Sequence, residues 1–153
     1  MMKLLLDTNI FIEAFKHQKE AQELLELLIE NSERIDIYVP FNVIEETTFL
    51  LIKRNTKIGY WQLKKNKSLV IENFKKAKPH LELILHLCKV LYPNKEVLFK
   101  AFYYIESYGL LPNDALVLSF CKTQNIPNLI SLDSDFSEVA KKERINLITS
   151  LED

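Results

Sequence analysis

Five acidic residues stand where a carboxylate could take part in chemistry, and three of them are placed by apolar neighbours. Asp7 ends the apolar run of residues 3–6, and Asp133 directly follows Leu132 at the end of the expected strand 128–132. Asp114 lies in the apolar segment LLPNDALVLSF, in the first turn of an expected helix. Structural roles are the alternatives: Asp7 as a helix N-cap, and Asp114 as an acid favoured by the helix dipole.

The remaining candidates, Glu46 and Asp135, must be distinguished from acidic residues close to them in the sequence. In a helix at about 100° per residue, Glu46 lies about 100° from the centre of the apolar face near Thr47, whereas Glu45 lies about 160° away. Glu46 is therefore the better candidate for an inward carboxylate, with a solvated helix charge as the alternative. Asp135 is followed by Glu138, a spacing typical of a capping box with Asp in the Ser/Thr position.

These acids can meet at one place. Asp7 and Asp133 end expected strands, while Glu46 and Asp114 lie near the starts of helices that follow crossovers. Carboxylates at such short distances repel each other. Hard divalent cations such as Mg²⁺ or Mn²⁺ prefer oxygen ligands and would neutralise this negative charge. Paired ions about 4 Å apart can activate water for in-line attack on a phosphodiester and stabilise the leaving oxygen. The pattern therefore indicates nuclease chemistry without a protein nucleophile.

The elements that must position these acids follow from short apolar runs that alternate with helical spacing. We expect strands at 3–6, 35–39, 128–132 and 145–149, helices at 8–31, 112–124 and 135–143, and two or three further helices within 57–108, broken at Pro79 and at Pro93 and Asn94. This alternation predicts a three-layer α/β/α domain around a parallel sheet of about four to five strands. Ligands bind such sheets at the carboxyl ends of the strands.

Length and composition agree with one soluble domain. The chain has 153 residues, 48% of them hydrophobic and 27% charged, so we expect a single domain over residues 1–153. Only two glycines occur, which excludes glycine-rich nucleotide loops. Cys88 and Cys121 show no zinc spacing and are expected to be buried, reduced thiols. No apolar run is long enough to span a bilayer, and the expected location is the cytoplasm.

Charge is distributed unevenly along the chain. The net charge is −1, yet residues 53–78 carry nine basic residues and one acid, Glu72. A local excess of this kind attracts a phosphate backbone, although a solvated helix face is the alternative. The RNA-binding candidates are Lys53, Arg54, Lys64, Lys65 and Lys67. Tyr60, Trp61 and Phe74 lie between these cations and could stack on bases, but we expect them to pack in a helical core.

At these residues the sequence resembles the PIN-domain family, metal-dependent ribonucleases that include VapC-type toxins of toxin–antitoxin pairs. The matching segments, in order across nearly the whole chain, are LLLDTNIFIEAF, VPFNVIEETTFLL, LPNDALVLSFCKTQNIPNLISLDSDF and INLIT. The resemblance implies a PIN-like fold. It also implies that Asp7, Glu46, Asp114 and Asp133 form the catalytic metal site, with Asp135 as an auxiliary acid.

The same resemblance implies supporting residues and partners. Thr8, Asn9 and Ser131 match polar positions expected to orient Asp7 and the attacking water. An RNA substrate, an antitoxin protein and a homodimer are the implied partners. Residues 56–107 depart from the family because they are longer than in compact toxins, and we interpret them as a helical insertion. This basic segment could grip RNA, dimerise or receive an antitoxin peptide.

Two other functions fit parts of the sequence. A catalytically inactive PIN-like module would bind RNA or a protein through the basic segment, with a steep dependence on salt and no saturable binding of divalent ions. A phosphoacceptor receiver domain would share the parallel sheet, but it generally needs a pair of acids at the end of the first strand, where this chain has only Asp7.

Overall fold

A parallel sheet forms the centre of the molecule. The computed structural model describes residues 1–149, and within them five strands pair in parallel in the order β3-β2-β1-β4-β5. The strands are β1 (Met2–Leu6), β2 (Ile35–Pro40), β3 (Lys89–Leu91), β4 (Asn128–Ile130) and β5 (Asn146–Ile148). The last four residues of the expected domain, 150–153, lie outside the described part.

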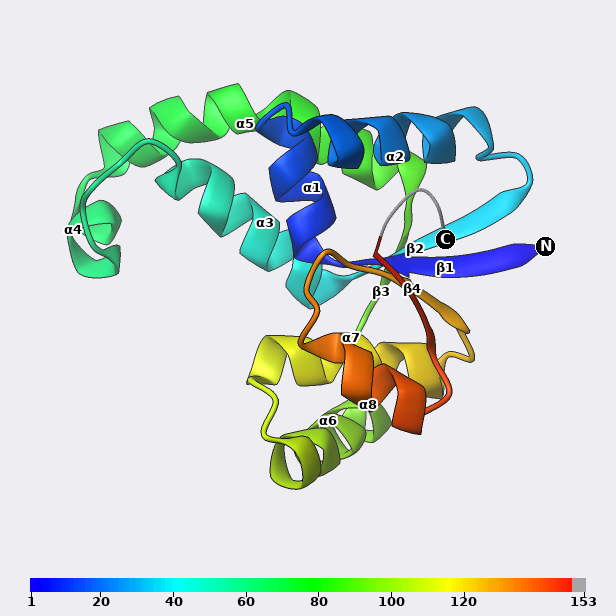
Figure 1. Ribbon diagram of the computed structural model, residues 1–153. Coiled ribbons are helices and arrows are strands. Elements are labelled where there is room, and N and C mark those ends of the chain that lie inside the picture. The colour runs from blue at the N-terminus through cyan, green and yellow to red at the C-terminus, as the bar shows by residue number, and fades with distance from the viewer. Residues whose placement is uncertain (150–153) are drawn as a thin grey trace.

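Helices cover both faces of this sheet, as Figure 1 shows, and the three-layer α/β/α prediction is confirmed. One layer contains α1 (Thr8–Phe15), α2 (Lys19–Glu30), α3 (Phe41–Lys53) and α5 (Lys67–Leu87), and the other contains α6 (Lys95–Tyr108), α7 (Pro112–Thr123) and α8 (Phe136–Lys142). The short α4 (Tyr60–Lys65) joins α3 to α5 at the end farthest from the sheet. None of the helices in residues 1–149 combines the length and apolar character needed to cross a membrane.

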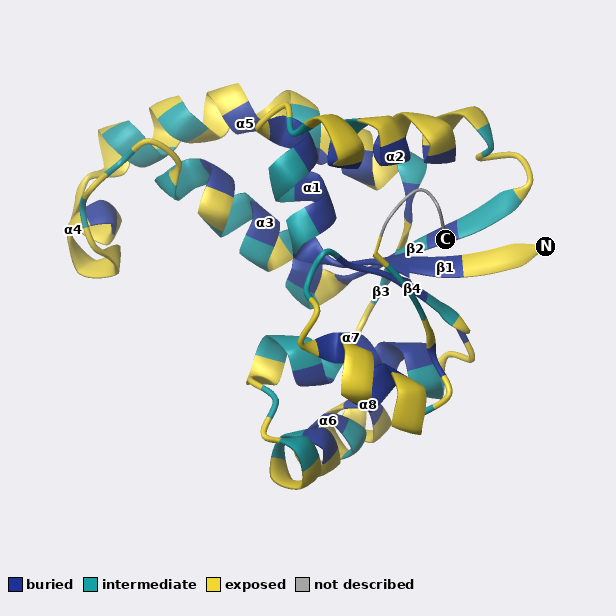
Figure 2. Ribbon diagram, in the orientation of Figure 1, coloured by how far each residue is buried: buried dark blue, intermediate teal, exposed yellow. Residues whose placement is uncertain are grey.

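The core lies between the sheet and its two helical layers. Leu4, Leu5 and Leu6 of β1 are almost completely buried because this central strand is covered on both faces. Figure 2 shows buried residues, in dark blue, on the sides of α1, α2, α6 and α7 that face the sheet, and exposed residues on their outer sides. Cys88 and Cys121 are both buried, as predicted.

Strand order places a switch point beside β1. The chain proceeds from β1 outward to β2 and β3 on one side, and β4 and β5 complete the sheet on the other. Both neighbours of β1 are parallel to it, so their carboxyl ends meet at one edge of the sheet. This edge is where a parallel α/β sheet leaves space for a ligand.

The middle of the chain differs from the prediction in two ways. Residues 56–107 are not purely helical, because they contain the short edge strand β3, which pairs with β2. Pro79 does not break a helix, since it lies inside α5. Buried contacts of Ala77, Leu81 and Ile84 hold α5 in place despite the backbone hydrogen bond that a proline cannot donate. The helix expected at 8–31 is divided, with His17 in a left-handed conformation (φ 62°) between α1 and α2.

Candidate metal centre

Asp7 is the most constrained acid of the carboxyl edge. Its backbone N–H donates to the Ile130 carbonyl (3.1 Å), which fixes it between β1 and β4. The side chain is only 4% exposed. Its Oδ1 accepts from the backbone N–H of Thr8 (2.8 Å), and its Oδ2 accepts from Ser131 Oγ (2.8 Å) and more weakly from Asn9 Nδ2 (3.4 Å). Asp7 thus serves as the N-cap of α1, as expected, and also faces the edge of the sheet.

Ser131 connects Asp7 to the loop that carries the next acid. Besides donating to Asp7, its buried Oγ accepts from Asn9 Nδ2 (3.1 Å) and from the backbone N–H of Asp133 (3.1 Å). Asn9 Oδ1 in turn accepts from the backbone N–H of Leu132 (3.0 Å). These contacts tie the loop after β4 to the start of α1 and hold Asp133 near Asp7.

Glu46 approaches the same edge from α3. It is half-buried, and its Oε2 accepts from Thr8 Oγ1 (3.1 Å), whereas Glu45 is exposed. The helical rotation of the two glutamates therefore correctly predicted that Glu46, and not Glu45, faces the site. Thr8 orients Asp7 through its backbone and Glu46 through its hydroxyl, so one residue positions two acids.

Asp114, the third residue of α7, brings an acid from the opposite helical layer. Its carboxylate is half-buried and has no hydrogen-bond donor within residues 1–149. Desolvation, and then the charges of Asp7, Asp133 and Asp135, raise its pKa to about 6.

The other carboxylates respond to the same environment. Burial raises the pKa of Asp7 to about 6, against the hydrogen bonds from Ser131 and Thr8, and the charges of Glu46 and Asp133 add to the rise. Desolvation and the charge of Asp114 also raise the pKa of Glu46 above its usual value. Burial is thus the main cause of the raised pKa values of Asp7, Glu46 and Asp114, and the charges of neighbouring acids, Asp133 among them, add to the rise.

Asp135 lies at the margin of this cluster. Its side chain is exposed and makes no capping hydrogen bond, although the residue stands at the N-cap position of α8. The capping-box prediction is wrong because the backbone there is already helical (φ −62°, ψ −21°), and Asp133 Oδ1 accepts the backbone N–H of Asp135 instead (2.9 Å). The side chain of Asp135 acts on the site through its charge, which adds to the raised pKa of Asp114.

The donor chemistry fits a hard divalent cation. As the side chains stand, no three His, Cys, Asp or Glu groups in residues 1–149 form a ready-made metal site. All the donors at this edge are carboxylate oxygens, the ligands that Mg²⁺ and Mn²⁺ prefer. Within residues 1–149, Asp114 accepts from no protein donor, and a cation would relieve the repulsion that the neighbouring acids exert on it.

A contact that the sequence analysis missed joins the two helices that carry Glu46 and Asp114. Asn42 Nδ2 donates to Asn113 Oδ1 (2.6 Å) and, at a longer distance, to the Asn113 carbonyl (3.4 Å). Each asparagine is the second residue of its helix, and a proline precedes it by two residues (Pro40) or by one (Pro112). That shared position was the available signal, but pairing across two layers cannot be inferred from it.

The basic RNA-binding candidates do not gather at the acids. Lys53 ends α3, Lys64 and Lys65 lie on α4, and Lys67 begins α5, all toward the end of this layer that lies away from the sheet (Figure 1). Arg54 Nη1 donates to the Phe15 carbonyl (3.2 Å), so this guanidinium also has a structural contact.

A parallel sheet of this order, with carboxylates converging on its carboxyl edge, defines a class of α/β proteins that have an acidic site at the switch point of the sheet. Residues 4–142 match the PIN domain model, and the chain belongs to the PIN domain family. The predicted resemblance is confirmed.

Similar proteins agree with this membership. The chain is 31% identical over 148 residues to ribonuclease VapC2 of Methanocaldococcus jannaschii, covering 95% of this chain and 94% of that protein. Its fold is similar to a chain of VapBC2 from Rickettsia felis, solved bound to a promoter DNA fragment (TM-score 0.66, 19% identity, 96% of this chain and 98% of that one). It is also similar to a chain of a toxin–antitoxin complex from Klebsiella pneumoniae (TM-score 0.63, 16% identity, 95% and 96% covered).

Ser131→Ala is expected to weaken the site through Asp7. The change removes a donor to Asp7 and an acceptor for Asn9 and the Asp133 backbone. Leaving buried partners unsatisfied costs about 1–3 kcal/mol of unfolding free energy. Loss of the bond that lowers the pKa of Asp7 moves the acid limb of the pH–activity profile to higher pH. Urea unfolding and a pH series measure both effects, and an unchanged acid limb would contradict them. Ser134→Ala, at an exposed neighbour, is the control.

Proposed function

We propose that this PIN-domain protein is an endoribonuclease that depends on Mg²⁺ or Mn²⁺ and hydrolyses RNA phosphodiester bonds. The observation that carries the proposal is the gathering of Asp7, Glu46, Asp114 and Asp133 at one sheet edge, where burial and the charges of neighbouring acids raise the pKa values of Asp7, Glu46 and Asp114. The ribonuclease named as a relative supports RNA as the substrate.

Each residue has a part in this proposal. Asp7, Glu46, Asp114 and Asp133 would hold the metal, with Asp135 adding negative charge at the margin. A Mg²⁺ or Mn²⁺ ion held there would supply neutralisation of these acids, activation of water and stabilisation of charge on the phosphate. Thr8, Asn9 and Ser131 keep Asp7 and Glu46 in fixed orientations, so that little reorganisation is needed when the substrate binds. Hydrolysis leaves a 3′-hydroxyl and a 5′-phosphate.

Cleavage of RNA under controlled metal conditions tests the proposal. The purified protein should cleave RNA with Mg²⁺ or Mn²⁺ and stop when EDTA is added, and mapping of the products should find 5′-phosphate ends. Calorimetric titration with Mn²⁺ should give saturable binding. RNA binding without cleavage and without saturable Mn²⁺ binding would instead favour the inactive PIN-like module.

The proposal includes an antitoxin as the partner of this protein. It rests on the fold shared with the chain from the Klebsiella pneumoniae toxin–antitoxin complex. Genomic context tests it directly, since a short reading frame just upstream should encode a protein that binds this one and inhibits RNA cleavage. A housekeeping nuclease would have no such neighbour, and its overproduction would leave growth unchanged.

A homodimer is the second partner that we propose, with α6 as the contact. Three neighbouring apolar side chains of α6 are exposed, Leu98 (41%), Phe99 (70%) and Phe102 (59%). An apolar patch of this kind is typical of a self-complementary interface. Phe102→Asp should convert a dimer to a monomer in light scattering, whereas Tyr92→Asp, at a similarly exposed aromatic outside α6, should not. A monomeric wild-type protein at micromolar concentration would contradict the proposal.

A further inference from the structure

The short helix α4 carries a surface that the acidic site does not use. We define the α4 tip as residues 57–67, which include α4 and the segments beside it. Figure 1 shows α4 at the outer end of the layer formed by α3 and α5, away from the sheet. Leu63 is buried and anchors α4, whereas the other five residues of the helix are exposed. The helix α4 is therefore buried at one residue and presents its other side chains to solvent.

Two aromatic rings dominate this exposed surface. Trp61 is 69% exposed and Tyr60 is 53% exposed, so the prediction that they pack in a core is wrong. Their rings meet edge to face with centroids 5.2 Å apart, and Phe49 of α3 supports Tyr60 from the other side at 5.9 Å. Large aromatic side chains left in water at a helix surface are more typical of binding sites than of folding contacts.

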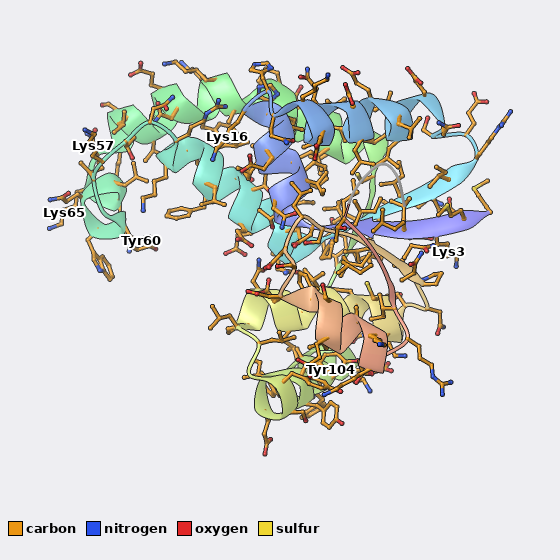
Figure 3. All side chains as sticks on the ribbon, viewed as in Figure 1. Lys3, Lys16, Lys57, Tyr60, Lys65 and Tyr104 are labelled. Carbon is orange, nitrogen blue, oxygen red and sulfur yellow. The ribbon has the colours of Figure 1, made fainter. Side chains whose placement is uncertain are left out.

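Unpaired cations surround these rings. Within residues 1–149, none of Lys57, Lys64, Lys65 and Lys67 forms an ion pair. Lys64 Nζ lies 5.4 Å from the centre of the Trp61 ring. Figure 3 shows Lys57 and Lys65 on the outer side of the tip and Tyr60 on the side that faces α3. The tip thus combines positive charge with exposed ring faces.

We propose that the α4 tip binds single-stranded RNA, with Trp61 and Tyr60 stacking on unpaired bases and the lysines contacting phosphates. Rings interspersed with cations are the combination that holds single strands, because every base has a face that stacks while the backbone is uniformly negative. A duplex would offer the same phosphates but hide the faces of its bases. This inference rests on the proposed ribonuclease function, for which it supplies the substrate class.

The place of the tip sets the length of RNA that can use it. From Glu46 to Lys53, α3 extends by about 10 Å at 1.5 Å per residue, and the tip lies beyond that end. A dinucleotide at the acids therefore cannot reach Trp61, whereas a longer strand can contact both places. The tip should lower the KM for long single strands without affecting the kcat for short ones.

Trp61 gives a direct readout because it is the only tryptophan in the chain. The titration uses the Asp114→Asn variant in EDTA, so that the RNA is not cleaved. The probe is a single-stranded oligouridylate of about 12 nucleotides, a length within the usual range of single-strand binding sites. Titration should quench Trp61 fluorescence. The same strand in an RNA duplex should quench it much less, and vesicles containing anionic lipid should not compete for the site.

Substitutions separate stacking from charge. Trp61→Ala should weaken binding of the single strand about 10-fold, as expected for one lost stacked base. Because this variant has no tryptophan, the affinities of the variants are measured by fluorescence anisotropy of an end-labelled strand. Lys64→Gln with Lys65→Gln should flatten the salt dependence of binding. Tyr103→Ala is the matched control, because Tyr103 is also exposed (52%) and lies under a lysine, Lys100 (5.5 Å), but on α6. Far-UV circular dichroism verifies the fold of each variant.

The outcomes distinguish the tip from the acidic site. Absence of quenching, equal quenching by duplex RNA, or unchanged affinity of Trp61→Ala would overturn the role of the tip, even if wild-type protein cleaves RNA. Quenching specific to single strands, with a higher KM for long RNA in Trp61→Ala, would support it. Wild-type protein that binds at the tip but never cleaves RNA would refute the proposed function while leaving RNA contact at the tip established.

Discussion

Asp114→Asn is expected to abolish RNA cleavage while making the metal-free protein more stable. The neutral amide removes one of the acids that would hold the metal, and loss of one such charge-stabilising interaction lowers the rate by about 10²-fold or more. The same change removes a carboxylate that has no hydrogen-bond donor within residues 1–149 and whose pKa is raised to about 6. After discounting for its partial exposure, we expect a gain of about 1 kcal/mol in the free energy of unfolding.

Opposite signs for activity and stability make this result diagnostic. If Asp114 had only a structural role, its substitution would destabilise the protein, and activity would be lost because the protein unfolds. Asp36→Asn provides the control, because Lys89 donates to Asp36 (2.7 Å) and holds the pKa of that carboxyl below its usual value. That variant should keep full activity and gain no stability. Urea unfolding in EDTA and RNA cleavage in Mn²⁺ measure the two effects, and an active Asp114→Asn protein would show that the proposed roles are wrong.

The convergence of the acids could be predicted because each has a local signal. Asp7 and Asp133 follow apolar runs, Glu46 follows from the rotation of one helix, and Asp114 follows Pro112 at a helix start. Parallel pairing of β1 with β2 and β4 then brings these positions to one edge. The rule that ligands bind at the carboxyl ends of strands needed only the order of elements.

Other features depend on contacts with residues that are distant in the sequence, which local sequence patterns do not reveal. β3 has only three residues, Lys89–Leu91, which is too short for an alternating apolar pattern to be recognised in the sequence. It forms a strand by pairing with the edge of β2. Pro79 remains inside α5 because buried neighbours hold the helix against the core. Local propensity favoured a break at that proline, and tertiary packing overrode it.

The hydrogen bonds around the acids show the same limit at the level of single atoms. Ser131 contacts three partners, including Asn9, which is 122 residues away in sequence. The expected polar residues were identified, but the division of labour, with the Thr8 hydroxyl on Glu46 and the Ser131 hydroxyl on Asp7, required coordinates. For Tyr60 and Trp61, helical spacing indicated core packing, and only the position of α4 at the outer end of its layer exposes them.

Stability of the metal-free protein is expected to fall as pH rises from about 4 to 7, with Asp7 as the main cause. Burial raises the pKa of Asp7 from 3.8 to about 6, so the folded protein binds its proton more tightly than the unfolded chain does. A raised pKa in the folded state gives stability that is complete below 3.8 and is lost as pH rises through about 6. The difference corresponds to at most about 3 kcal/mol.

Mn²⁺ should reverse this trend, because the ion binds the ionised carboxylates that destabilise the folded state. Above about pH 6 the added ion should raise the free energy of unfolding, and near pH 4, where protons compete for the same oxygens, it should have little effect. Asp7→Asn should flatten the pH dependence in EDTA and remove the response to Mn²⁺, while Asp36→Asn should retain both. Urea unfolding at several pH values, with and without Mn²⁺, measures these quantities. A wild-type protein that gains stability between pH 4 and 7 in EDTA would show that burial and repulsion at Asp7 are not the dominant electrostatic effect in this fold.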